Sequence, residues 1–351
     1  MVYFVLCALC VFVSRRLSST NHFRGTKRAE TAQWRLTVIK KLVCLLTLSC
    51  ALGGCGKVNP AASERQAKSS PTPMTCSATD LRQRIETIAR VTGGPVGVAV
   101  ALIGSDEILA VNGQKHFPMQ SVYKLPIGMA ILHQIDQGTL KLDQKVVVKP
   151  SEYVGSGQVS PLRDRNPRGA ELTINELLTY AVSVSDGTAS DVLMRVAGGA
   201  GAVMSYLRSL GIDGVMVVDT EMEIGRDSQV QYRNWATPES AIALLRIVAD
   251  GRSLSPASHE LLIKLMTETQ TGPNRIKGML PPGTVVAHKT GSSGTIGGLT
   301  RATNDIGLVT LPDGKQMAIA VFVSDTKAGR EAAESVIAKI TRASWDCWVK
   351  Q

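Results

Sequence analysis

The sequence predicts an α+β fold in which strands from both ends of one domain form a single antiparallel sheet, with a largely helical stretch inserted between them. Short apolar runs typical of strands occur soon after residue 95 and again after residue 284. Residues 122–270 are instead dominated by the apolar period of helices. With 351 residues, of which 44% are hydrophobic, the chain is long enough to bury the core that this fold needs.

The individual elements follow from local patterns. Strands are expected at residues 96–103, 108–111, 285–289, 299–310 and 316–324. Helices are expected at residues 80–91, 122–137, 174–184, 188–197, 202–210, 238–250, 258–268 and 329–345. Ser77 or Thr79 would cap the first helix, and the sequence Leu-Pro-Asp-Gly at 311–314 predicts a hairpin turn between the last two strands.

The charge distribution argues against a nucleic-acid partner. The formal net charge is +10, from 39 Lys and Arg against 29 Asp and Glu. Residues 1–54 hold eight of the basic residues and one acidic residue, which leaves +3 for the rest of the chain. A nearly balanced body lacks the basic surface that binds a phosphate backbone.

Cysteines and histidines form no pattern for a metal site. Five of the seven cysteines lie in the first 55 residues, and only Cys76 and Cys347 remain for the domain. Two thiolates cannot build a structural zinc centre, and the five histidines lack the close spacing of metal ligands. No G-x-x-x-x-G-K loop or G-x-S-x-G elbow is present. We therefore expect neither a metal nor another cofactor.

Residues 1–54 are expected to be a leader. Lys40 and Lys41 precede an apolar run at residues 42–52, which is too short to span a bilayer as a helix but is typical of a secretory signal peptide. Residues 1–34 contain a second short apolar run, for which a misassigned upstream start is one explanation.

The leader ends in Leu-Gly-Gly-Cys, which resembles the bacterial lipobox. This resemblance implies cleavage before Cys55 and acylation of its thiol; ordinary cleavage without a lipid is the alternative. Residues 55–77 would then be a lipidated N-terminus and flexible tether, rich in Pro, Ser, Ala and Lys over residues 59–73. These features predict export across the inner membrane to the periplasm, with membrane contact only through the lipid.

Ser121 and Lys124 form an S-x-x-K pair at the start of an expected helix. Their spacing places a hydroxyl and an amine on one helical face, one turn apart, so a base stands beside a nucleophile. Free backbone N–H groups and the positive dipole end at a helix N-terminus would favour an oxyanion there. The pattern also occurs by chance, and an exposed serine cap is the alternative.

Two further motifs follow in order. Ser-Asp-Gly occupies 185–187 between two expected helices, and Lys-Thr-Gly occupies 289–291 at the end of an apolar strand. The order S-x-x-K, S-D-N, K-T-G is typical of class A β-lactamases and penicillin-binding proteins, although the second motif here ends in glycine. The chain resembles class A serine β-lactamases over residues 78–346, most clearly at residues 120–132, 180–199, 231–238 and 303–323.

That resemblance implies a three-layer α/β/α architecture. Its five-stranded antiparallel sheet would be formed from both termini of a β-lactamase domain at residues 78–351, with an all-helical subdomain at about residues 122–270. In this fold the first and last helices pack side by side, so Cys76 and Cys347, which flank them, would form a disulfide or remain as two free thiols.

The resemblance also implies a base for deacylation. Glu221 stands 36 residues after Ser185, in a segment similar to the family's Ω-loop. Ungapped alignment back from Thr237 selects Glu221 over Glu223 as the general base. The alternative is that both glutamates are solvated loop charges. A desolvated glutamate could hold a pKa suited to moving protons.

The remaining catalytic roles follow from the same resemblance. Ser121 would attack the lactam carbonyl, activated by neutral Lys124, by Glu221 through a water molecule, or by both. Ser185 would pass a proton to the departing lactam nitrogen. Lys289 would supply a positive charge that anchors the substrate carboxylate and aids that transfer.

Substrate binding would involve the residues that follow Lys289. Thr290 and Ser292 would donate hydroxyl hydrogen bonds to the substrate carboxylate, and the backbone N–H groups of Ser121 and Ser292 would form the oxyanion hole. Gly291 would let the strand backbone approach the ligand closely.

Four positions depart from the family pattern. Gly187 replaces an asparagine whose amide contacts the acylamido side chain of the substrate. Gly225 stands where many relatives have an asparagine that helps to hold the hydrolytic water. Asp219 and Asn234 replace an arginine and an aspartate that often clamp the Ω-loop, so we expect an altered or more mobile loop.

Together these features predict a monomeric β-lactamase that opens penicillins and cephalosporins through a Ser121 acyl-enzyme and thereby gives antibiotic resistance. One alternative is a penicillin-sensitive D,D-peptidase or transpeptidase of the same fold. The other is a non-hydrolysing, penicillin-binding sensor. Glu221 is the feature that favours the hydrolase, because only this enzyme needs a base to release the acyl group rapidly.

Overall fold

The computed structural model describes residues 76–349. The predictions for the leader, for lipidation at Cys55 and for the tether as far as residue 75 lie outside the described residues. Within residues 76–349, no helix combines the length and the apolar character needed to cross a membrane.

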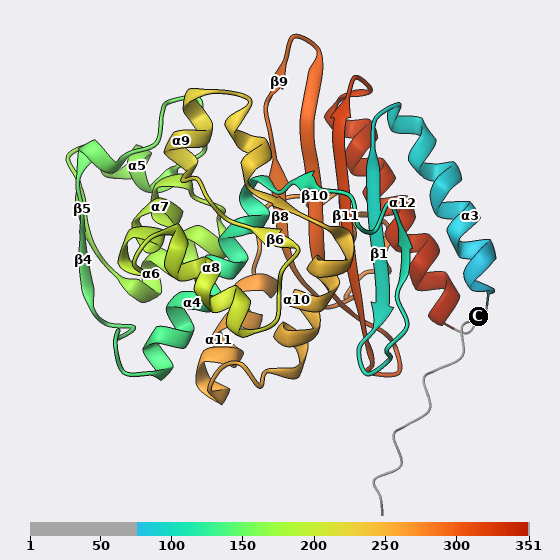
Figure 1. The fold of residues 1–351 in the computed structure, drawn as a ribbon, viewed down its shortest axis with the longest axis horizontal. Coiled ribbons are helices and arrows are strands. Elements are labelled where there is room, and N and C mark those ends of the chain that lie inside the picture. The colour runs from blue at the N-terminus through green and yellow to red at the C-terminus, as the bar shows by residue number, and fades with distance from the viewer. Residues whose placement is uncertain (1–75, 350–351) are drawn as a thin grey trace, which may run out of the picture. The chain divides into compact units, whose positions relative to one another are not determined.

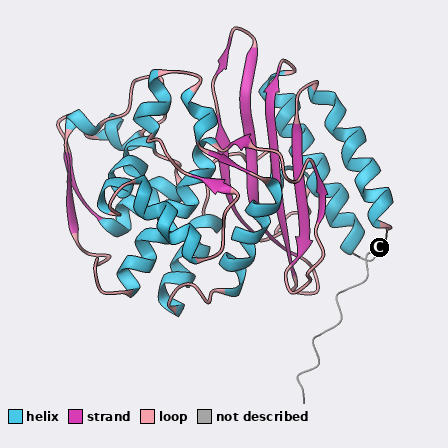
Figure 2. Cartoon of the chain, in the orientation of Figure 1, coloured by secondary structure: helices cyan, strands magenta, loops and turns pink. Residues whose placement is uncertain are grey.

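The main sheet is antiparallel and runs in the order β2-β1-β11-β10-β8, with the short strand β9 paired to β10 (Figures 1 and 2). Its strands are β1 Val96–Leu102, β2 Leu109–Val111, β8 Val286–Ser292, β9 Thr295–Ile296, β10 Leu299–Thr310 and β11 Gln316–Thr326. The N-terminal strand β1 pairs along its whole length with the C-terminal strand β11. The predicted α+β fold, with one sheet built from both ends, is confirmed; β9 adds a sixth strand to the five expected.

Both faces of the sheet are buried, which explains why β1 and most of β11 are apolar. Val96, Val98 and Val100 of β1 belong to the core under helices α3 Ala78–Ala89 and α12 Gly329–Trp348. The alternate residues Ala99 and Ala101 belong to the core on the opposite face, where helix α10 Pro238–Asp250 packs on β1 and β11. The small alanine side chains let this helix approach the sheet closely.

Between β2 and β8 the chain forms a mainly helical insert around the buried helix α4 Lys124–Asp136. The other helices of the insert are α5 Pro161–Arg165, α6 Ile174–Leu178 with a π-helical turn Thr179–Ser183, α7 Gly187–Val196, α8 Ala200–Ser209, α9 Glu221–Arg226, α10, and α11 Pro256–Thr267. Every residue of α4 from Lys124 to Leu132 is buried. A mostly apolar helix that is buried on all sides belongs in the centre of a core, and here it fixes Lys124, the last residue of the S-x-x-K motif.

The insert is not all-helical, contrary to expectation. It contains the paired strands β4 Lys145–Val148 and β5 Ala170–Thr173, and a small sheet formed by β3 Phe117–Pro118, β7 Trp235–Ala236 and β6 Val215–Met216. Strands of two to four residues are too short to show a clear alternation of apolar and polar residues. Four turns of 3₁₀ helix near the site or core are η1 Arg90–Thr92, η2 Gln120–Tyr123, η5 Val230–Arg233 and η6 Ile276–Met279.

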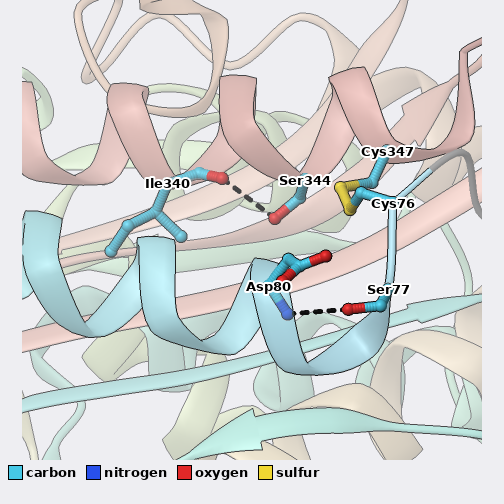
Figure 3. The surroundings of a disulfide bond; sticks show 6 residues. All are labelled: Cys76, Ser77, Asp80, Ile340, Ser344 and Cys347. Carbon is cyan, nitrogen blue, oxygen red and sulfur yellow. Dashed lines mark hydrogen bonds between the residues drawn. A yellow bond between two sulfur atoms is a disulfide. The ribbon is translucent and has the colours of Figure 1, made fainter.

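A disulfide joins Cys76 to Cys347, with the two Cα atoms 5.2 Å apart (Figure 3). Helices α3 and α12 lie side by side on one face of the sheet (Figure 1). Ser77 caps α3 by accepting a hydrogen bond from the Asp80 backbone N–H at 3.0 Å, one residue after the disulfide. Of the two alternatives left by the sequence, a bond or two free thiols, the structure contains the bond.

Opening this disulfide should lower the stability of the fold. The bond closes a loop with a sequence separation of 271 residues, so its loss frees a large part of the unfolded chain. We expect Cys76→Ser with Cys347→Ser to lower the free energy of unfolding by about 2–5 kcal/mol, measured by urea denaturation. Wild type treated with reductant should behave like the variant, and equal stability of oxidised and reduced protein would contradict the prediction.

Candidate active site

A cavity of about 810 Å³ lies between the helical insert and the β8 edge of the main sheet. Ser121, Lys124, Ser185, Glu221 and Ser292, which are far apart in the sequence, all line it. The structure therefore brings the residues selected from the sequence into one place. The cavity is large enough for a drug-sized molecule.

Ser121 lies in the 3₁₀ turn η2 and Lys124 is the first residue of α4. The Lys124 Nζ donates a hydrogen bond to the Ser121 Oγ at 2.7 Å. Gln120, just before the serine, has a φ of 48°, a left-handed conformation that is uncommon for a residue with a side chain. A tight turn thus precedes the helix and aims the serine hydroxyl at the lysine.

Lys124 also contacts both other parts of the site. Its side chain is 1% exposed, and its Nζ lies 2.9 Å from the Glu221 Oε2 and 3.1 Å from the Ser185 backbone oxygen. A buried ammonium needs partners of this kind because leaving water is costly for a charge. One amine therefore joins the serine hydroxyl to the carboxylate.

Glu221 is the first residue of helix α9, and the local capping pattern explains its orientation. Thr220 and Glu223 form a capping box, in which the Glu223 carboxylate accepts from the Thr220 backbone N–H at 2.7 Å. Glu223 is thereby engaged at the exposed helix end. Glu221, the residue favoured by the sequence alignment, is the one that faces Lys124.

Opposing effects act on the Glu221 carboxyl. Burial raises its pKa, but the Lys124 charge, and hydrogen bonds from Lys124, Tyr123 and Gln158, outweigh burial and bring the pKa below its ordinary value. The Tyr123 hydroxyl donates to the Glu221 Oε2 at 3.0 Å. Glu221 is consequently a carboxylate at neutral pH, the form that accepts a proton.

Asp191 holds the backbone of Glu221, and no sequence pattern indicated it. Its two carboxylate oxygens accept from the Glu221 N–H at 2.7 Å and from the Met222 N–H at 2.9 Å. The residue lies on α7, one turn after the second motif, where a polar side chain looks like any other helix residue. Burial raises the pKa of Asp191 to about 7.

Replacing Asp191 should change how stability depends on pH. Its pKa in the folded state lies above the ordinary value of 3.8, so between about pH 4 and about pH 7 the folded protein holds a proton that the unfolded chain has released. This titration lowers the stability as pH rises through that window. Asp191→Asn cannot titrate, so the stability of wild type relative to the variant should fall from about pH 4 to about pH 7.

Melting temperatures measured across this pH range test the prediction, with the exposed Asp213→Asn as a control. A constant difference between wild type and Asp191→Asn would show that Asp191 does not titrate in this window.

Ser185 lines the cavity and is hydrogen-bonded to Lys289. The Lys289 Nζ donates to the Ser185 Oγ at 2.8 Å and to the Thr290 backbone oxygen at 3.0 Å. Burial, reinforced by the Lys124 charge, holds the pKa of Lys289 well below its ordinary value. A negative group entering the cavity would oppose this shift, because it favours the ammonium form.

The K-T-G motif lies inside strand β8, which continues beyond the predicted end at residue 289 and pairs with β10 as far as Ser292. A Cβ at Gly291 would overlap the Met119 backbone oxygen. The glycine is thus needed so that β8 can pack against the turn that carries Ser121, whereas the sequence suggested an approach to ligand.

Arg275 lies at the β8 end of the cavity, and sequence reasoning missed it. Its side chain is 3% exposed and its Nη2 donates to the Ser292 Oγ at 2.6 Å and to Glu334 at 3.0 Å. It precedes η6, in a segment without a motif. Thr290 lies close by, with its hydroxyl hydrogen-bonded to that of Thr271.

The Ω-loop is held by Asn234 in place of the ion pair found in many relatives. The fully buried Asn234 side chain accepts from the Val218 N–H at 2.7 Å and the Asp219 N–H at 2.9 Å, and donates to the Asp219 oxygen at 2.8 Å. Asp219 pairs instead with Arg233 at 3.3 Å. Asp219 and Asn234 therefore form no ion pair with each other, and an altered or more mobile loop stays a prediction.

Gly187, the altered residue of the second motif, makes room for Glu221. A Cβ at this position would lie 2.8 Å from the Glu221 Cγ. Asp186, beside it, accepts from the Leu162 and Ala189 backbone N–H groups at 2.7 and 2.9 Å and so holds its loop. An asparagine at 187 would require the carboxylate to move.

Ser121, Lys124 and Glu221 are connected in that order by short polar contacts, and the K-T-G strand β8 lines the same cavity. This arrangement of a hydroxyl, an amine and a carboxylate is typical of a serine hydrolase site. The model of the Beta-lactamase enzyme family matches residues 80–348. Curated relatives include the beta-lactamase VEB-1 of Pseudomonas aeruginosa, 37% identical over 78% of this chain and 91% of the relative. The extended-spectrum beta-lactamase PER-1 of the same species is 40% identical, over 77% of this chain and 88% of the relative.

Solved structures agree with these sequence relatives. The crystal structure of the TLA-1 extended-spectrum beta-lactamase superposes with a TM-score of 0.76 at 42% identity, covering 78% of this chain and all of the other. A beta-lactamase from Chitinophaga pinensis gives a TM-score of 0.74 at 45% identity, covering 76% of this chain and 98% of the other. The chain belongs to the beta-lactamase enzyme family, and within it to the class A serine hydrolases.

Proposed function

We propose that this β-lactamase opens the amide bond of penicillins and cephalosporins through an acyl-enzyme on Ser121, which is released by water activated by Glu221, and that this activity gives antibiotic resistance. The observation that carries the proposal is the position of the Lys124 Nζ, 2.7 Å from the Ser121 Oγ and 2.9 Å from the Glu221 Oε2. The same amine and carboxylate can serve both halves of the reaction.

In the acylation half, the Ser121 oxygen attacks the lactam carbonyl carbon while its proton passes through a water molecule to Glu221, or to Lys124 once this amine has given a proton to Glu221. The backbone N–H groups of Ser121 and Ser292 would stabilise the oxyanion by about 3 kcal/mol each. When the C–N bond breaks, Ser185 donates its proton to the lactam nitrogen. Lys289, 2.8 Å from the Ser185 Oγ, can replace that proton.

In the deacylation half, Glu221 takes a proton from a water molecule whose oxygen attacks the ester carbonyl. The lowered pKa of Glu221 keeps the base ionised at neutral pH. The proton then returns to the Ser121 oxygen as the ester bond breaks, with Lys124 between the two groups. A D,D-peptidase or a penicillin sensor has no need of a carboxylate here, so the placement of Glu221 favours hydrolysis.

The substrate carboxylate would bind at the opposite end of the cavity. Thr290 and Ser292 line the cavity and offer hydroxyl groups, Lys289 precedes Thr290 on β8, and Arg275 donates to the Ser292 Oγ. Arg275 is a cation close to this group, and an entering carboxylate favours the ammonium form of Lys289, which suits a substrate that carries a carboxylate beside its lactam ring.

Mass spectrometry with benzylpenicillin tests the chemistry. Wild type should turn the drug over with only a transient adduct, whereas Ser121→Ala should form none. Glu221→Ala should accumulate the acyl form, because removal of a general base slows its step by about 10²–10⁴-fold. A stable adduct on wild type would overturn the hydrolase proposal, and unchanged turnover by Glu221→Ala would identify another base.

We propose further that the leader exports the protein to the periplasm, that a lipid on Cys55 anchors it to the membrane, and that it acts as a monomer. The support is the Leu-Gly-Gly-Cys sequence after an apolar run. In cells fed a radioactive fatty acid, wild type should be labelled and sediment with membranes, and Cys55→Ser should be unlabelled. Equal labelling of the two proteins would rule out Cys55 as the attachment site.

A further inference from the structure

Two amide side chains that many class A enzymes place around the general base are replaced here by Gly187 and Gly225. The amide side chain of Gln158 lies against the backbone of Glu221 and beside Gly225. Gln158 belongs to the segment that precedes α5 and lines the same cavity as Glu221 and Gly225. Its contacts assign it a part in the reaction.

The carboxamide of Gln158 is fixed at both ends. Its Oε1 accepts from the Gly155 backbone N–H at 3.1 Å, and its Nε2 donates to the Glu221 backbone oxygen. This links two segments that are 63 residues apart in the sequence. The first residue of α9 is therefore held from two sides, by Gln158 at its carbonyl and by Asp191 at its N–H.

The backbone around Gln158 is also held. The Arg163 Nη1 donates to the backbone oxygens of Val154, Gly155 and Gln158 at 3.0, 2.6 and 3.2 Å. The Gln158 N–H donates to the Gly155 oxygen at 2.9 Å. Because this short turn is tied to one guanidinium, the Gln158 side chain leaves from a defined position.

Gln158 and a side chain at residue 225 exclude each other. A Cβ built on Gly225 would overlap the Gln158 Oε1 and Cδ, and would lie 2.9 Å from its Nε2. Gly225 has no left-handed φ that would demand glycine. The absence of a side chain at 225 is thus explained by the amide that fills its space.

We propose that Gln158 is a positioning residue for deacylation, whose carboxamide occupies the space that an asparagine at 225 would take and there orients Glu221 and the water it activates. This inference rests on the proposed acyl-enzyme mechanism. The Nε2 supplies a donor beside the base, as an asparagine amide would, but from a different segment of the chain.

Electrostatics agree with this placement. The hydrogen bond from Gln158 contributes to the lowered pKa of Glu221, after burial and the effects of Lys124 and Tyr123. The other charged groups that act on this carboxyl are Asp191 on α7 and Lys289 on β8. An uncharged amide can orient a carboxylate and a water molecule without changing the charge of this crowded site.

The first experiment separates the two halves of the reaction in Gln158→Ala. Acylation by benzylpenicillin, followed by rapid-quench mass spectrometry, should keep its wild-type rate. Deacylation should slow about tenfold or more, the effect of losing one hydrogen bond that positions the base. In steady state kcat and KM should therefore fall together, with kcat/KM nearly unchanged. The exposed Gln137→Ala is the matched control and should match wild type.

A second variant tests whether the space at residue 225 is what matters. Gly225→Asn should slow deacylation while Gln158 is present, because the two side chains overlap. In the double variant Gln158→Ala with Gly225→Asn the asparagine has room, and deacylation should recover at least in part from the Gln158→Ala value. A role for Gln158 limited to holding its own turn predicts no recovery.

A third variant gives a pH readout. Gln158→Glu keeps an oxygen that can accept from Gly155 but replaces the donor with a carboxylate oxygen beside Glu221. The added negative charge raises the pKa of Glu221, so the acidic limb of the deacylation rate should move to higher pH. Should Gln158→Ala fail to fold, Gln158→Met, which keeps the bulk without polar atoms, replaces it.

The outcomes are distinct. Deacylation by folded Gln158→Ala or Gln158→Met at the wild-type rate would overturn the inference, as would the absence of recovery in a folded double variant. A stable adduct on wild type would instead overturn the proposed hydrolysis, before Gln158 is considered. Slowed acylation with normal deacylation would place Gln158 in the wrong half of the reaction.

Discussion

The buried pair of Lys124 and Glu221 is the interaction on which the rest of the site depends. An ammonium with 1% exposure and a carboxylate with 12% exposure lie 2.9 Å apart. Burying either charge alone would cost several kcal/mol, so each must be supplied with opposite charge and hydrogen bonds. Ser121, Ser185 and Tyr123 provide these bonds: the Lys124 Nζ donates to the Ser121 Oγ and to the Ser185 backbone oxygen, and the Tyr123 hydroxyl donates to the Glu221 carboxylate.

Because Lys124 is fixed in the central helix, the position of Glu221 must be set by the segment that carries it. That segment is short, and α9 has only six residues. It is held by contacts from outside itself: Asp191 at the helix start, Gln158 at the first carbonyl and Asn234 at the preceding residues. These three contacts explain how a loop without an ion pair between residues 219 and 234 can still present its carboxylate.

The sequence predicted those parts of the fold and site that depend on local patterns. Helix and strand periods located the main sheet and its helices, and S-x-x-K spacing paired Ser121 with Lys124. The sequence did not predict the roles of Asp191, Gln158 and Arg275. Each of these residues contacts a segment between 16 and 63 residues away, and the periodicity of a sequence does not indicate such a contact. The short strands of the insert were not predicted either, because they are defined by pairing with distant strands rather than by an alternation of apolar and polar residues.

A glycine that stands where the family motif has a larger residue can indicate such a long-range contact. Gly187 and Gly225 appeared in the sequence only as lost amides, which would suggest a weakened site. The structure shows that a side chain at 187 would meet Glu221, and one at 225 would meet Gln158. At residue 225 the space that a side chain would take is used by Gln158, which comes from a distant segment. A single Gly225→Asn substitution, which restores the family residue, should then harm the enzyme, since the neighbour that fills the space must change with it.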